Sequence, residues 1–80
     1  MFGFAKGKVK TTLTITDMQC SMCEAHINEA VRKAFTVNSV KSSARKHETV
    51  IWSDEPIPDE QIRAVIKETG YTLTNIISMQ

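Results

Sequence analysis

Hydrophobic and polar residues alternate strictly near the start of the chain, over VKTTLTITD at residues 9–17. Val9, Leu13 and Ile15 fall on one face together with Thr11, whereas the residues between them are lysine or threonine. This alternation predicts a β-strand with one buried face and one face in contact with water.

The spacing of hydrophobic positions changes to three and four residues directly after this strand, which predicts an amphipathic helix ending near Phe35. The positions that follow the spacing are Cys23, Ile27, Ala30, Val31 and Ala34. Ser21 and Glu24 have the S-x-x-E spacing of a capping box, which predicts Ser21 as the N-cap residue. Cys23 then falls in the first turn of the helix, and Cys20 falls just before its start.

Two weaker strands, a second helix and a last strand are expected in the remainder. The pattern of residues 37–54 predicts two strands, and the chain reverses direction between them near residues 45–47. Val40, Ser42 and Ala44 share one face of the first strand, and Val50 and Trp52 share one face of the second. Pro58 suits the first position of the second helix, with Ile62, Val65 and Ile66 buried and Gly70 just beyond its end. Residues 71–77 complete the order βαββαβ.

This order predicts an α+β fold of the ferredoxin-like type, a four-stranded antiparallel sheet with two helices on one face. We expect a flexible N-terminal tail at residues 1–7 and a single domain at residues 8–80. Because the fold places the first strand before the first helix, both cysteines are expected in the loop that joins them.

Charge and hydropathy narrow the functional classes. The net charge of +1 argues against nucleic acid as a partner, which would require a basic surface. The sequence has no apolar run long enough to insert in a membrane and no signal peptide at its start, so we expect a cytoplasmic protein. Its own start and an end just after the last strand predict a free-standing protein. In the cytosol, a close cysteine pair is expected to be reduced and to bind metal or carry out catalysis.

The segment DMQCSMCEAH, residues 17–26, contains both cysteines of the chain in a C-x-x-C spacing. A helix N-terminus favours the thiolate, which is both the metal ligand and the nucleophile, so the spacing alone does not separate metal binding from redox chemistry. The absence of proline or an aromatic residue beside the cysteines makes a dithiol redox protein the less favoured reading. A closed zinc site needs four ligands, and Cys20, Cys23 and His26 supply at most three. Two thiolates suffice for Cu(I), which soft sulfur ligands select.

The segment DMQCSMC resembles the M-x-C-x-x-C loop of the heavy-metal-associated domain family. IRAVIKETGY, residues 62–71, resembles the second helix of that family and the loop after it, and the resemblance extends roughly from Val9 to Ile77. It implies that Cys20 and Cys23 are the metal ligands, that Met18 lies beneath the loop, and that Tyr71 lies near the metal. It also implies a non-enzymatic Cu(I) chaperone that passes the ion to a heavy-metal P-type ATPase or a similar metal-accepting domain.

Two residues leave the identity of the bound metal undecided. Asp17 stands where the family usually has glycine, and His26 follows Cys23 by three positions, so that it is a candidate third ligand. Both leave an alternative in which the chain binds Zn(II), Cd(II) or Hg(II). We expect a monomer, with a metal-bridged dimer through His26 as the alternative.

Overall fold

The computed structural model describes residues 7–79, and the order of its elements confirms the predicted βαββαβ arrangement. The elements are β1 (Val9–Ile15), α1 (Ser21–Ala34), β2 (Ser39–Ser43), β3 (Glu48–Ser53), α2 (Asp59–Thr69) and β4 (Leu73–Met79). Of the tail expected at residues 1–7, all but Gly7 lies outside the described residues. Within residues 7–79, neither helix is long and apolar enough to cross a membrane.

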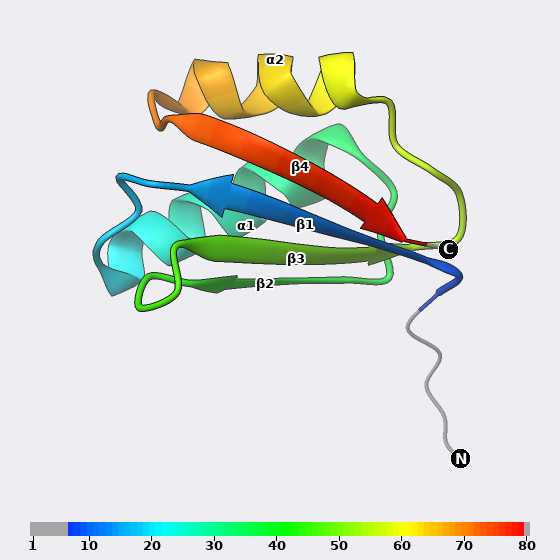
Figure 1. The fold of residues 1–80 in the computed structure, drawn as a ribbon, viewed down its shortest axis with the longest axis horizontal. Coiled ribbons are helices and arrows are strands. Elements are labelled where there is room, and N and C mark those ends of the chain that lie inside the picture. The colour runs from blue at the N-terminus through cyan, green and yellow to red at the C-terminus, as the bar shows by residue number, and fades with distance from the viewer. Residues whose placement is uncertain (1–6, 80) are drawn as a thin grey trace.

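The four strands form one antiparallel sheet in the order β2-β3-β1-β4, and both helices cover the same face of it (Figure 1). This is the expected α+β fold of the ferredoxin-like type. The core lies between the sheet and the helices. Its buried members include Leu13 and Ile15 from β1, Ile27 and Val31 from α1, Ile51 from β3, and Ile62 and Ile66 from α2.

The alternation in β1 is confirmed, since Val9, Thr11, Leu13 and Ile15 are all buried. Val50 and Trp52 do share one face of β3, but that face points away from the helices, and Thr49, Ile51 and Ser53 occupy the core side. The sequence ETVIWS does not show which face of β3 is buried, because both faces carry apolar residues.

The polar sequence of β2 is compatible with its position beside the core because the hydroxyl group of Ser42, on its inward face, is hydrogen-bonded. The Ser42 hydroxyl donates to the Asn28 side-chain oxygen of α1 at 2.6 Å and lies 2.8 Å from the Thr49 hydroxyl oxygen of β3. A buried hydroxyl costs little when it is hydrogen-bonded. Ser42 therefore connects α1 to the sheet where a larger apolar side chain would be usual.

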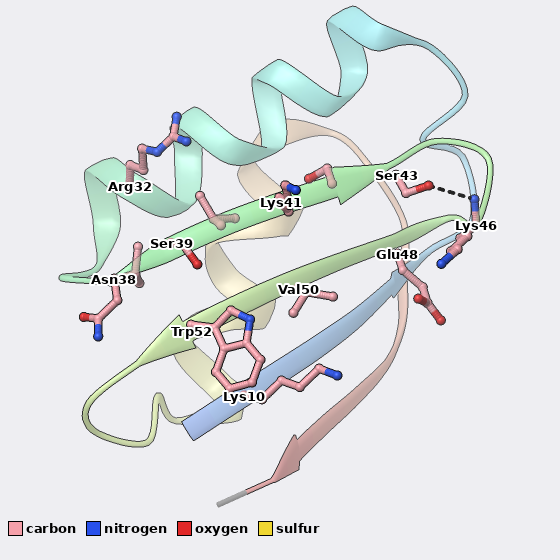
Figure 2. A pocket seen from close by; sticks show the side chains of 13 residues that line it. Lys10, Arg32, Asn38, Ser39, Lys41, Ser43, Lys46, Glu48, Val50 and Trp52 are labelled. Carbon is pink, nitrogen blue, oxygen red and sulfur yellow. Dashed lines mark hydrogen bonds between the residues drawn. The ribbon is translucent and has the colours of Figure 1, made fainter. Parts of the chain in front are cut away.

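An open hollow lies over β2 and β3, and Figure 2 shows Lys10, Val50 and Trp52 among its lining side chains. The Lys10 ammonium lies 5.7 Å from the centroid of the Trp52 ring, a cation–π distance. Neither cysteine lines this hollow. The hollow is therefore separate from the dithiol.

Three connections meet at one end of the molecule: the β1–α1 loop, the β2–β3 turn and the α2–β4 turn (Figure 1). The Ile15 amide donates to the His47 carbonyl at 2.8 Å, and the Thr16 amide donates to the Thr72 carbonyl at 3.2 Å. Gly70 ends α2 in the left-handed conformation, with φ 88°, as its type predicts. The fold thus brings residues near 16, 47 and 72 around the cysteine loop.

Candidate metal centre

Cys20, rather than Ser21, is the N-cap residue of α1, which corrects the expected capping box. Its backbone is extended, with φ −147° and ψ 166°, and its sulfur accepts a hydrogen bond from the Cys23 amide at 3.3 Å. A Cys Sγ here takes the place of the hydroxyl oxygen that usually caps this position. Backbone amides at a helix start lack partners within the helix, and the Cys20 sulfur accepts from one of them.

Glu24 does not close a capping box either, because its carboxylate bonds to a different element. The Ala44 amide, in the β2–β3 turn, donates to Glu24 Oε2 at 2.7 Å. This bond spans 20 residues of sequence and holds the turn against the first turn of α1. A local motif in the sequence was thus replaced by a tertiary contact of the same carboxylate.

The surroundings of the Cys23 thiol lower its pKa. Hydrogen bonds from the Cys20 and Tyr71 side chains and from the Gln19 backbone lower the pKa of Cys23 from 9.0 to about 7. The hydrogen bond to Cys23, together with partial burial and the nearby negative charges, raises the pKa of Tyr71 to about 12. Tyr71 therefore stays protonated near neutral pH and donates to the Cys23 sulfur, which is half in its thiolate form at pH 7.

Asp17 does not face the cysteines with a free carboxylate. Its Oδ1 accepts from the Thr72 amide at 2.8 Å, and its Oδ2 accepts from the Thr72 hydroxyl at 3.1 Å. These bonds, led by the one from the Thr72 amide, lower the pKa of Asp17. Both carboxylate oxygens are therefore engaged by a residue 55 positions away, and binding a metal through Asp17 would require breaking these bonds.

Met18 is buried completely beneath the loop, with no exposed surface. The Thr49 hydroxyl of β3 lies 3.9 Å from the Met18 sulfur, within range of a weak O–H···S contact. Met22, between the two cysteines, is instead 67% exposed. The two methionines of the motif thus differ in role, one supporting the loop from inside and one standing at its surface.

The two histidines are not brought to the dithiol as a ligand group. His26 is exposed on α1, and no set of three His, Cys, Asp or Glu side chains within residues 7–79 is arranged to hold a metal. His47 lies in the β2–β3 turn with φ 58°, half-buried, and its Nδ1 is buried without a hydrogen-bond partner. The structure therefore gathers Cys20, Cys23 and Tyr71, and leaves His26 apart from them.

One residue of the site, Thr72, has no counterpart among the residues that the sequence indicated. Its role depends on the contact with Asp17, and no local pattern reports a pairing between residues so far apart. The only signal was indirect: Asp17 departs from the glycine that the family resemblance leads one to expect, so a partner for it could have been sought.

The pH dependence of thiol alkylation should reveal the perturbed pKa. We expect iodoacetamide to modify Cys23 with a rate midpoint near pH 7, because the hydrogen bonds described above lower its pKa to about 7. A folded pKa below the unfolded value also means that this thiolate stabilises the reduced apoprotein at about pH 9 and loses that effect as the pH falls through about 7. Mass spectrometry of peptides alkylated between pH 5 and 10 measures the midpoint.

Tyr71→Phe is the matched variant for that experiment, since it removes the donor hydroxyl and keeps the ring. We expect it to raise the Cys23 midpoint, and Met22→Ala, at an exposed neighbour, to leave it unchanged. An unshifted midpoint in Tyr71→Phe would contradict the assigned hydrogen bond.

The model of the heavy-metal-associated domain family matches residues 12–72 of this chain. A search of curated proteins with the same chain found no match. A heavy metal binding protein from Thermotoga maritima is similar at 17% identity and TM-score 0.71, with 88% of this chain and 98% of that chain covered. The N-terminal domain of ZntA in its Zn(II) form has 24% identity and TM-score 0.73, covering 82% and 89%. The copper chaperone Atx1 from Synechocystis PCC6803 has 24% identity and TM-score 0.68, covering 79% and 97%.

At these identities the solved structures show a shared fold, whereas the family model also covers the β1–α1 loop with both cysteines and extends to Thr72. The match spans most of the chain and includes the segment that the structure places at the cysteine end. On this basis, the chain belongs to the heavy-metal-associated domain family.

Proposed function

We propose that this protein is a non-enzymatic carrier of a soft metal ion, with Cu(I) as its cargo and Cys20 and Cys23 as the ligands. The observation that carries the proposal is the closeness of the two cysteines at the start of α1, where their side chains are hydrogen-bonded and the Cys20 sulfur also accepts from the Cys23 amide at 3.3 Å. Soft thiolates select Cu(I), and two of them satisfy its low coordination number.

The electrostatics of the loop support this assignment. The Cys23 pKa of about 7 makes a thiolate available at this residue near neutral pH, and metal binding then displaces less than one proton from it on average. Tyr71, as its donor, lies beside the site without offering a competing anionic ligand. Met18 supports the loop from below through packing, and we assign it no ligand role.

Exposure of the loop supports transfer rather than storage. Cys20 is exposed, and Met22 beside it is 67% exposed, so another thiolate can approach the ion from outside. We infer that a partner dithiol attacks the bound ion, that the ion passes through three-coordinate thiolate intermediates, and that the carrier sulfurs leave one at a time. A metal-accepting domain of a heavy-metal P-type ATPase, in the cytoplasm, is the kind of partner that fits this exchange.

The alternative cargo is Zn(II), Cd(II) or Hg(II). Of these three ions, Zn(II) fits this geometry least well. Zn(II) takes four ligands, whereas Asp17 is engaged by Thr72 and His26 is not gathered with the sulfurs. A Zn(II) ion would need water or a second protein molecule to complete its shell. The geometry within the described residues therefore favours the metal of lower coordination number.

Competitive loading tests the choice of metal directly. The reduced protein is mixed with equal amounts of Cu(I) and Zn(II) in the presence of glutathione, and native mass spectrometry reads the mass of the bound ion. We expect one Cu(I) ion per monomer and no retained Zn(II). Retention of Zn(II) in place of Cu(I) would contradict the copper assignment, and retention of neither would contradict the carrier role. His26→Ala tests the third-ligand alternative, and we expect it to load as the wild type does.

A further inference from the structure

The contact between Asp17 and Thr72 joins the cysteine loop to the loop that carries Tyr71. Thr72 gives both of its hydrogen-bond donors, the amide and the hydroxyl, to the two oxygens of one carboxylate, at 2.8 and 3.1 Å. Hydrogen bonds to a charged acceptor are stronger than neutral ones, and two of them fix orientation as well as distance. We refer to this pair of bonds as the Asp17–Thr72 link.

The residue directly before Thr72 is Tyr71, the donor to Cys23. The Tyr71 amide is held from the other side, where it donates to the Thr69 hydroxyl at 3.3 Å, at the end of α2. Tyr71 packs, half-buried, against the core. The Asp17–Thr72 link therefore closes a ring of contacts from Asp17 through Thr72 and Tyr71 to Cys23, and back along the loop to Asp17.

A loop that loses one of its anchors can move its ring away from the sulfur. Without the carboxylate, the bond from the Thr16 amide to the Thr72 carbonyl at 3.2 Å would remain between the two loops, and it does not engage either donor of Thr72. Gly70, exposed and in the left-handed conformation just before Tyr71, adds no side-chain restraint. Loss of the Asp17 carboxylate would thus free both donors of Thr72, directly beside Tyr71.

We propose that Asp17 is a positioning residue of the metal centre: by holding both donors of Thr72, it keeps Tyr71 against Cys23 and slows release of the bound ion. Only the part of this inference that concerns release of the ion rests on the proposed function. A Tyr71 ring held at the sulfur screens the ion from an incoming ligand, and this screening opposes release.

Asp17 thereby acquires a role different from a metal ligand. An acidic residue beside a dithiol could bind a cation, but here the Asp17 carboxylate accepts hydrogen bonds from Thr72. The distinction is testable because asparagine can replace the carboxylate in the link. The Asn oxygen accepts from the Thr72 amide, and its NH₂ donates to the Thr72 hydroxyl, so the geometry survives while the charge is lost.

The first measurement is the rate at which Cu(I)-loaded protein gives its ion to an excess of bathocuproine disulfonate, read by absorbance in a stopped-flow instrument. We expect Asp17→Ala to speed release about three- to tenfold, from loss of two charge-assisted hydrogen bonds in an exposed setting. Asp17→Asn should stay within about twofold of the wild type. Asp54→Ala is the control, since Asp54 also accepts a side-chain bond, from Asn38 at 3.1 Å, but follows β3 at the far end of the molecule (Figure 1).

A double-mutant cycle tests whether Asp17 acts through Tyr71. If it does, Tyr71→Phe speeds release by itself, and adding Asp17→Ala to it changes the rate by less than about twofold. An unreduced effect of Asp17→Ala in the Tyr71→Phe background would overturn the proposal, as would equal acceleration by Asp17→Asn and Asp17→Ala. A rate for Asp17→Ala equal to that of the wild type would overturn it while leaving the carrier function intact.

A second measurement needs no metal, so it separates this inference from the proposed function. In the reduced apoprotein, we expect Asp17→Ala to speed hydrogen exchange of the Thr72 amide about tenfold and to weaken the nuclear Overhauser contact between the Tyr71 ring and the Cys23 side chain. Asp17→Asn should preserve the Overhauser contact. If the wild type fails to hold Cu(I), the carrier function is wrong, and this measurement still decides the positioning role. An unchanged Overhauser contact in Asp17→Ala would overturn it.

Discussion

Replacing both Cys20 and Cys23 by serine is expected to reduce Cu(I) binding to background, and either single replacement is expected to weaken it by about 10²–10⁴-fold. The single variants lose the second sulfur, and with it the high effective concentration that a paired ligand provides. Serine oxygen is a hard ligand that does not replace a thiolate for Cu(I). Competition with a strong chelator under reducing conditions measures the affinity.

Serine is a suitable replacement because the fold should survive it. Cys20 is the N-cap residue of α1, and serine is among the preferred residues at that position. Cys20→Ser should therefore keep the helix, as read by circular dichroism, while losing metal. Wild-type affinity in the double variant would contradict the assignment of the ligands, and a loss of helix would show that the substitution acted on folding instead.

Met18→Ala is expected to lower the free energy of unfolding of the reduced apoprotein by about 2–5 kcal/mol, the range for truncating a buried side chain of this size. Met18 has no exposed surface, and it lies beneath the loop in contact with the core. Its loss leaves a cavity under the segment that carries both cysteines. Urea unfolding followed by Trp52 fluorescence measures the change.

Met22→Ala is the matched control, because Met22 belongs to the same motif but is 67% exposed. We expect it to change the free energy of unfolding by less than about 0.5 kcal/mol. Met18→Leu should cost less than about 1.5 kcal/mol and keep the Cu(I) affinity of the wild type, since it preserves volume and removes only the sulfur. A large loss of affinity in Met18→Leu would contradict a purely supporting role for Met18.

The order of the elements could be predicted because each depends on local periodicity. The alternation around Leu13 and the three- and four-residue spacing around Ile27 are properties of short segments, and both are confirmed. The start of α1 was predicted one residue late. Serine is a common N-cap, but here the Cys20 sulfur accepts the bond from the Cys23 amide. A propensity rule ranks residue types and carries no information on which side chain points at the Cys23 amide.

Contacts between distant segments explain most of what could not be predicted. Glu24 was expected to bond within its own helix turn, yet the Ala44 amide competes for it successfully from the β2–β3 turn. The burial of β3 was ambiguous because apolar residues lie on both of its faces. The side that became the core is the one that the register with β1 turns toward the helices.

The fold class, the placement of the C-x-x-C pair at the start of a helix, and the resemblance to a metal-binding family could all be inferred from the amino-acid sequence. These follow from hydrophobic period and from residues within one short segment. The surroundings of that pair depend on contacts made in the folded chain, where Thr72 bonds to Asp17 and the Ala44 amide bonds to Glu24. These contacts could not be read from local patterns because a carboxylate bonds to whichever donor the folded chain brings within reach, at any distance along the sequence.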